Sequence, residues 1–116
     1  MKTKQAIAAL GALAQETRLA AFRLLVQAGP DGLPAGEIAE KLDLPASSLS
    51  FHLAQLTQAG MVVQLRAGRS LIYSIDFQSM NGLMAYLTEN CCGGNASACM
   101  PVCEPATKSV KSRRIA

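Results

Sequence analysis

Four cysteines within thirteen residues are the part of this sequence best suited to chemistry. They are Cys91, Cys92, Cys99 and Cys103, and the 116-residue chain contains no other cysteine. An even count can indicate disulfides, but a chain of this length can bury a core large enough to fold without them. Thiolates are soft ligands that select soft metals and metalloids. The cluster therefore predicts metal binding or redox sensing in a reducing compartment.

Composition indicates one folded domain that must position this cluster. Half of the residues are apolar, 4% are aromatic and 16% are charged. This is enough for a compact core built from Ala, Leu, Ile, Val and Met, so global disorder is not expected. No apolar run approaches the roughly 18 residues that a membrane-spanning helix needs, so we expect no membrane association.

The net charge of +3 is distributed unevenly. Residues 1–104 carry a net charge of −1, whereas residues 105–116 carry four basic side chains and no acidic one. The overall charge therefore does not by itself indicate a nucleic-acid-binding protein, and any basic surface must come from the placement of single cations. Residues 104–116 read as a solvated, flexible basic tail.

The N-terminus allows two interpretations. Lys2 and Lys4 precede the apolar stretch Ala6–Ala14, a pattern also found in short signal peptides. The stretch is rich in Ala and Gly rather than Leu, and Ile7, Leu10 and Leu13 recur at helical spacing. We expect an amphipathic helix and a cytoplasmic protein.

Further helical patterns cover residues 16–28, 34–42 and 45–59. Gly29-Pro30 ends the first, Leu44-Pro45 separates the second from the third, and Gly60 is a suitable residue just beyond the last. The two short helices joined by a tight turn predict a helix-turn-helix.

A β-hairpin and a final helix follow. Val63 and Leu65 alternate with polar residues, as do Leu71, Tyr73 and Ile75, and Ala67-Gly68 is predicted to form the turn. Asp76 is a predicted N-cap for a helix over 77–89, which carries an apolar stripe of Met80, Leu83, Met84 and Leu87. The expected fold is mainly α with a β-hairpin wing (α+β), a winged helix-turn-helix.

Several short motifs resemble the ArsR/SmtB family of bacterial metalloid- and metal-responsive repressors. The resemblance covers about residues 6–90, and its motifs are Ala12-Leu13-Ala14, Glu16-Thr17-Arg18-Leu19, Ser48-Leu49-Ser50-Phe51-His52-Leu53, Leu56, Ala59-Gly60-Met61-Val62, Arg66-Ala67-Gly68-Arg69 and Tyr73. It implies a homodimer in which the first and last helices form the interface, here through Ile7, Leu10, Met80, Leu83, Met84 and Leu87.

The helix over 45–59 presents a surface suited to double-stranded operator DNA. Leu49, Leu53 and Leu56 share one side, while the other side carries small hydroxyls, amides and one aromatic ring without any Lys or Glu. Such groups can donate to phosphates, pair with adenine or touch a thymine methyl. The predicted DNA contacts are Ser47, Ser48, Ser50, Phe51 and Gln55, with Arg66 and Arg69 of the wing.

Two aromatic side chains of this helix keep alternatives open. Phe51 can contact a base or sugar, or pack against the hairpin. His52 is predicted to pack or to contact a phosphate rather than to bind a metal, because the chain has no second histidine. The same lone histidine lacks a neighbouring nucleophile, so we expect no enzymatic activity and no organic cofactor.

The resemblance also bears on the cysteines. Some family members place sensing ligands in the helix before the recognition helix or as histidines on the last helix, but residues 36–42 contain no Cys and residues 77–89 no His. A C-terminal cluster is similar to the arsenite-binding trio of other arsenical repressors, which implies Cys91, Cys92 and Cys99 as ligands. Cys103 is a possible alternative or fourth ligand; the shorter loop favours Cys99.

Ligand chemistry agrees with this implication. Three thiolates neutralise a trivalent arsenic centre, whereas four thiolates on zinc leave a charge of −2, and adjacent cysteines reach a tetrahedron less easily than CxxC pairs. We therefore expect a repressor of an arsenical-resistance operon that As(III), or Sb(III), releases from DNA. The alternatives are a repressor that senses Cd, Pb or Zn or thiol oxidation, and a soft-metal scavenger. The expected organisation is 1–90 for DNA binding and dimerisation, 91–103 for sensing, and 104–116 for the tail.

Overall fold

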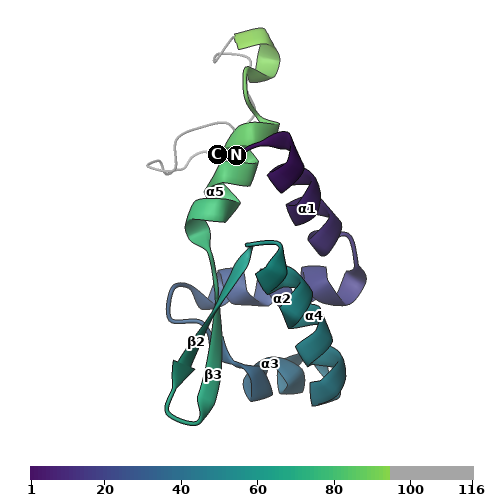
Figure 1. The fold of residues 1–116 in the computed structure, drawn as a ribbon, viewed down its shortest axis with the longest axis vertical. Coiled ribbons are helices and arrows are strands. Elements are labelled where there is room, and N and C mark those ends of the chain that lie inside the picture. The colour runs from purple at the N-terminus through teal and green to yellow at the C-terminus, as the bar shows by residue number, and fades with distance from the viewer. Residues whose placement is uncertain (95–116) are drawn as a thin grey trace, which may run out of the picture. The chain divides into compact units, whose positions relative to one another are not determined.

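The computed structural model describes residues 1–94 of the chain. The chain divides into two compact units, Met1–Tyr86 and Leu87–Ala116. The first contains the helix-turn-helix and the wing (Figure 1). In the second, the described residues include one short 3-10 turn that begins at the first cysteine.

The element order matches the predicted winged helix-turn-helix. The elements are α1 (Thr3–Leu13), α2 (Glu16–Ala28), β1 (Leu33–Pro34), α3 (Ala35–Leu42), α4 (Ala46–Gln58), β2 (Val62–Ala67), β3 (Ser70–Ile75), α5 (Phe77–Leu87) and the 3-10 turn η1 (Cys91–Gly94). In the described part of the chain, no helix is both long and apolar enough to cross a membrane.

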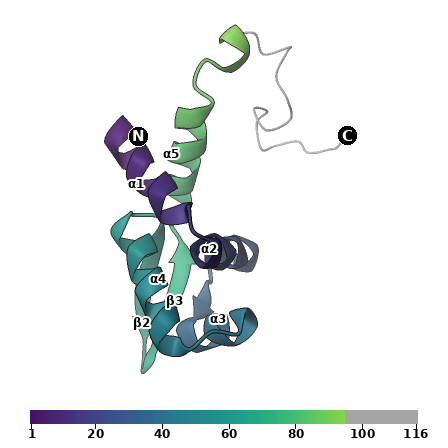
Figure 2. The same ribbon diagram turned by 90° about the vertical axis from the view of Figure 1, so that its right-hand side faces the viewer.

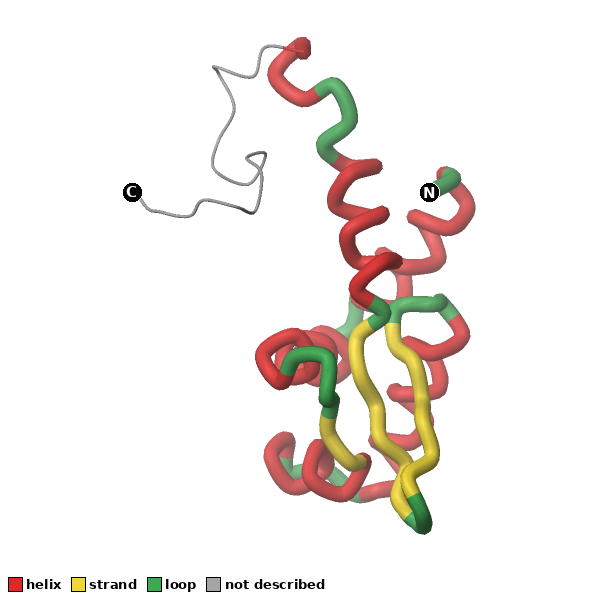
Figure 3. The backbone as a smooth tube through the Cα atoms, turned by 90° about the vertical axis from the view of Figure 1, so that its left-hand side faces the viewer, coloured by secondary structure: helices red, strands yellow, loops and turns green. Residues whose placement is uncertain are grey.

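The sheet has three strands rather than the two of the predicted hairpin. Its order is β1-β3-β2, all antiparallel, and the added strand pairs Leu33 with Tyr73 and Pro34 with Ile72 (Figure 3). The prediction that a helix begins at Pro34 was wrong, because this residue belongs to β1 and α3 begins one residue later. The hairpin turn itself extends past α3, where it can reach a partner (Figures 1 and 3).

The core is built around one side of α4. Leu49, Leu53 and Leu56 are at most 1% exposed, as the helical spacing predicted. They lie in one cluster with Leu25 of α2 and Ile38 of α3, and Figure 2 shows α4 beside the sheet and α2 end-on. Burial of each such side chain contributes about 1.5–3 kcal/mol, so this cluster fixes the orientation of α4.

Side chains and backbone geometry at the helix ends explain the boundaries. The side chain of Gln15 accepts a hydrogen bond from the Arg18 N–H at the start of α2, and Asp76 accepts one from the Ser79 N–H at the start of α5. Asp76 is thus the N-cap that the sequence predicted. Pro45 is the N-cap of α4 rather than its first helical residue, and Asp43 ends α3 in the left-handed conformation.

The alternating apolar residues Val63 and Leu65 of β2 face solvent rather than the core. Val62 is buried, but Val63 and Leu65 are exposed, Leu65 by 62%. Gln64 lies opposite Tyr73 and donates a 2.7 Å hydrogen bond to its hydroxyl. The alternating pattern of Val63 and Leu65 therefore does not mark a core face. The exposed amide of Gln64 instead satisfies the hydroxyl of the buried Tyr73.

Gly32 allows the turn before β1 to approach β3 closely. Its φ is +69°, and a Cβ at this position would lie 2.2 Å from the carbonyl oxygen of Tyr73. No side chain fits there without moving the backbone, so the third strand depends on this glycine.

We therefore expect Gly32→Ala to destabilise the protein by about 2 kcal/mol or more, since it combines a positive φ with a backbone clash. Gly36→Ala is the matched control: it lies in α3 with no atom within 4 Å of the added Cβ, and it should stabilise by about 0.5–1 kcal/mol. Urea unfolding of both variants checks this, and equal stabilities would contradict the close approach.

Candidate nucleic-acid interface

The outer side of α4 carries the polar surface that the sequence predicted. Ser47, Ser48, Ser50 and Phe51 are exposed, and Gln55 is half-buried. No charged residue lies in α4. Hydroxyls, an amide and an aromatic ring on a helix held from behind by leucines form a surface that can enter a major groove.

Phe51 does not pack against the hairpin. Its side chain is 59% exposed, and its ring meets that of His52 edge-on, with centroids 5.4 Å apart. Of the two alternatives, this exposure disagrees with packing against the hairpin, and contact with a base or sugar stays a prediction. An exposed aromatic ring on the outer side of a recognition helix is available for a base methyl or a sugar.

His52 is engaged by an arginine that the sequence reasoning did not single out. Arg18 donates from Nε to the Ala12 carbonyl at 2.6 Å, and its Nη1 lies 3.3 Å from Nδ1 of His52. Arginine only donates, so Nδ1 is the acceptor. The guanidinium thus joins the end of α1 to the middle of α4. This contact joins residues 34 positions apart, so local periodicity carries no signal for it.

The wing holds two cations at its tip. Arg66 lies on β2 opposite Leu71, and Arg69 lies in the turn. The turn is Gly68-Arg69, with φ of +63° at Gly68, rather than the predicted Ala67-Gly68. Both arginines are exposed, where they can reach phosphates.

The residues predicted for a dimer contact divide into two groups. Ile7, Leu10, Met84 and Leu87 are exposed apolar side chains, with Ile7 at 64%, and Met80 is half-buried. Leu83 is only 5% exposed because it belongs to the chain's own core. A side chain this buried offers a partner almost no surface, so the structure does not agree with a direct interface contact by Leu83.

Of the predicted cysteine site, the structure describes only the first part. Cys91 begins η1, half-buried, and its N–H donates to the Thr88 carbonyl at 2.9 Å. Cys99 and Cys103 lie outside the described residues. Within residues 1–94, no group of three His, Cys, Asp or Glu side chains could hold a metal ion.

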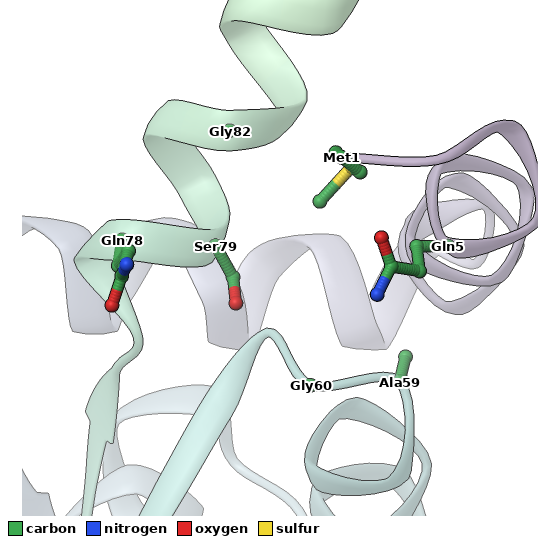
Figure 4. A pocket seen from close by; sticks show the side chains of 7 residues that line it. All are labelled: Met1, Gln5, Ala59, Gly60, Gln78, Ser79 and Gly82. Atoms are coloured by element: carbon green, nitrogen blue, oxygen red, sulfur yellow. The ribbon is translucent and has the colours of Figure 1, made fainter.

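A pocket of about 410 Å³ lies where α1, α5 and the turn after α4 meet (Figure 4). Gln5, Gln78 and Ser79 supply its polar groups, and Ala59, Gly60, Gly82 and Met1 supply the remaining lining. Beside it, the Asp76 N–H donates to the Met61 carbonyl at 3.0 Å, which ties the start of α5 to the start of the wing.

Comparison with known proteins agrees with this geometry. Residues 13–64 match a family model described as a helix-turn-helix domain. The chain is 33% identical over 89 residues to the HTH-type transcriptional regulator YgaV of Escherichia coli K12, which covers 77% of this chain and 88% of that protein. It is 40% identical over 63 residues to a putative arsenical resistance operon repressor ArsR of Halobacterium salinarum, covering 54% of this chain and 48% of that protein.

A solved structure extends the comparison to the fold. An ArsR-like transcriptional regulator from Rhodococcus sp. RHA1 superposes with a TM-score of 0.64 over 75% of this chain and 78% of that one, at 24% identity. The chain belongs to the ArsR/SmtB family. This ArsR-family protein is a transcriptional regulator that binds DNA, and it is not an enzyme.

Substitutions of Phe51 and Leu53 distinguish the contribution of α4 to DNA binding from its contribution to folding. We expect Phe51→Ala to change the free energy of unfolding by no more than about 0.5 kcal/mol, since the ring is largely exposed. It should weaken DNA binding about fivefold or more, which corresponds to roughly 1 kcal/mol. The core substitution Leu53→Ala should cost about 2–5 kcal/mol of stability.

Urea unfolding and fluorescence-anisotropy titration with DNA from the regulator's own promoter check both parts. A Phe51→Ala protein with normal DNA affinity and reduced stability would contradict the assigned role.

Proposed function

We propose that this ArsR-family regulator is a cytoplasmic homodimeric repressor of an arsenical-resistance operon, released from operator DNA when As(III) binds its cysteines. Cys91 and Cys92 are two ligands, and Cys99 or Cys103 is the third. One observation carries the proposal: four thiols within thirteen residues begin just after α5, on a chain with a DNA-reading helix. The likeness to the Halobacterium protein named for arsenical resistance supports it.

The DNA-binding half of the proposal rests on α4 and the wing. Ser47, Ser48, Ser50, Phe51 and Gln55 read base edges, while Arg66 and Arg69 contact phosphates or the minor groove. Since residues 1–104 carry a net charge of −1, binding depends on a few well-placed cations rather than on overall charge.

The dimer half rests on exposed apolar side chains of α1 and α5. Ile7, Leu10, Met84 and Leu87 are large, apolar and solvent-facing in the single chain. Side chains of this kind gathered on two helices are typical of an interaction surface. A symmetric dimer through these helices presents two copies of α4, whose separation must match about one turn of DNA.

The choice of As(III) rests on donor chemistry. Soft sulfur ligands favour soft centres, and three thiolates with a trivalent centre form a neutral unit that is cheap to hold near apolar surface. The other sensing positions of the family are empty of suitable donors here: residues 36–42 have no Cys, and α5 has no His. Sb(III) has the same ligand preference and is an expected second inducer.

The route from sensor to DNA follows the chain. The cysteines begin four residues beyond the last residue of α5, and α5 is joined to α1 by a 2.5 Å hydrogen bond between the hydroxyls of Thr3 and Tyr86. At its other end it is joined to the wing through Asp76 and Met61. A shift of α5 therefore alters the dimer surface and the wing together. Coupling of this type is typically about 1–3 kcal/mol.

The same thiols also suit a repressor that senses a divalent soft metal such as Cd, Pb or Zn, or one that senses thiol oxidation. A soft-metal scavenger uses the thiols but has no need for an uncharged hydroxyl and amide surface on α4, so the α4 surface favours a regulator.

Operator recognition gives the first test. We expect Ser50→Ala and Gln55→Ala to relax sequence preference, so that affinity falls for the operator and little for scrambled DNA. Arg66→Ala with Arg69→Ala should weaken binding to the operator and to scrambled DNA alike and make the salt dependence of binding shallower. Gel shifts over a salt series measure both effects, and unchanged binding by all four substitutions would place the DNA surface elsewhere.

Induction gives the second test, with a reporter gene under the regulator's own promoter. Cys91→Ser and Cys92→Ser should abolish the arsenite response while repression persists, because the thiols lie outside the DNA-reading helix. Cys99→Ser should reduce the arsenite response more than Cys103→Ser, because Cys99 as the third ligand closes a shorter loop than Cys103. Cys103→Ser is the matched control.

Parallel titrations with Cd(II), Zn(II) and a thiol oxidant identify the inducer. If one of these induces the reporter at concentrations where arsenite does not, that compound rather than arsenite is the inducer. A full arsenite response in the Cys91→Ser protein would exclude the cluster as the sensor.

A further inference from the structure

A continuous groove runs between α1 and α4. One part, of about 250 Å³, is lined by Ala8, Gly11, Ala12, Arg18, Gln55, Gln58 and Ala59. The other, of about 440 Å³, is lined by Lys2, Lys4, Gln5, Ala8, Gln58, Ala59 and Gly60. The two parts adjoin at Ala8, Gln58 and Ala59, which line both, and together we call them the α1–α4 groove.

Positive charge is concentrated in this groove. Residues 1–94 contain seven Lys and Arg side chains, and Lys2, Lys4 and Arg18 line the groove. Among the described residues that line it, none is Asp or Glu, although residues 1–94 as a whole carry as many acidic as basic side chains. The remaining polar lining consists of glutamine amides, which donate to phosphate oxygens as readily as to bases.

The groove occupies its own face of α1. Lys4, Ala8 and Gly11 lie four and three residues apart and share this side of the helix. The buried Ala6 and Ala9 lie on a second side. The exposed Ile7 borders the groove side, three residues after Lys4 and four before Gly11, and Leu10 lies beyond it.

The groove is also continuous with the DNA-reading surface. Gln55 borders it and belongs to the predicted reading set, and Gln58 lies one turn beyond the exposed Ala54. Small residues along it, Ala8, Gly11, Ala59 and Gly60, leave room for a bulky chain to approach both helices. A basic groove that adjoins α4 is complementary to a negatively charged partner that also contacts α4.

We propose that the α1–α4 groove binds the sugar–phosphate backbone of the operator beside the half-site that α4 reads. Lys2 and Lys4 supply ammonium groups to phosphates, and Arg18 supplies guanidinium N–H groups, two of its five being used for Ala12 and His52. This inference rests on the proposed reading role of α4, and it makes α1 a DNA-contacting element as well as a dimer helix.

Phosphate contacts have a measurable signature. Each one releases condensed counterions, so log Kobs against log[salt] gains a slope of about −0.9 per phosphate neutralised. Removing such a contact weakens binding to all sequences alike and makes the slope shallower, whereas losing a base contact changes sequence preference.

The test compares two variants that each lose two positive charges. Lys2→Gln with Lys4→Gln removes the groove lysines, and Arg23→Gln with Lys41→Gln removes two exposed cations outside both groove and wing. Operator and scrambled duplexes are titrated over a salt series with the full chain. We expect the groove variant to lose roughly 3–4 units of slope per dimer, about 0.9 for each lysine lost from the two protomers, with equal loss of affinity for both duplexes, and the control variant to lose clearly less.

Lys4→Gln alone covers the case in which the change at Lys2, the N-cap of α1, disturbs the helix. It should lose about half of the effect with an unchanged unfolding midpoint. Equal slopes in the groove and control variants would overturn the inference while leaving α4 as the reader. Normal operator preference in Ser50→Ala and Gln55→Ala would overturn the reading role of α4, and the groove assignment with it.

Discussion

The arrangement of this regulator depends on one packing interaction, the burial of a single leucine face of α4. Leu49, Leu53 and Leu56 lie in the same cluster as Leu25 and Ile38. Because a helix buried on one side has only one outward side, this packing decides which hydroxyls and amides can face DNA. It also holds α4 rigid, so a change elsewhere can move the helix as a unit but cannot easily reshape its surface.

The connections around α4 suggest how such a movement is transmitted. Arg18 joins α4 to the end of α1, and the Thr3–Tyr86 hydrogen bond joins the start of α1 to the end of α5. The backbone hydrogen bond from Asp76 to Met61 joins the start of α5 to the start of the wing. The helices predicted to form the dimer surface and the elements predicted to face DNA are thus joined to one another by hydrogen bonds.

Much of this could be predicted from local sequence. The period of the leucines located α4 and its buried side, Gly29 ended α2, and Asp76 started α5. Features set by distant partners could not. The two-residue β1 exists because Gly32 lets the chain approach Tyr73, and the Arg18–His52 contact joins different helices. The alternation in β2 indicated a strand but did not show which of its faces is buried. Helical spacing in α5 likewise could not show that Leu83 enters the core while Met84 faces solvent.

We propose that arsenite lowers operator affinity by binding the thiols of an intact dimer. A fluorescence-anisotropy titration of operator DNA with the purified reduced protein, with and without arsenite, tests this when the mass of the protein in solution is measured alongside. We expect the protein to stay dimeric and folded and to bind DNA about 5- to 150-fold more weakly with arsenite, the range that a coupling of about 1–3 kcal/mol gives. Undiminished affinity, or dissociation into monomers on adding arsenite, would contradict it.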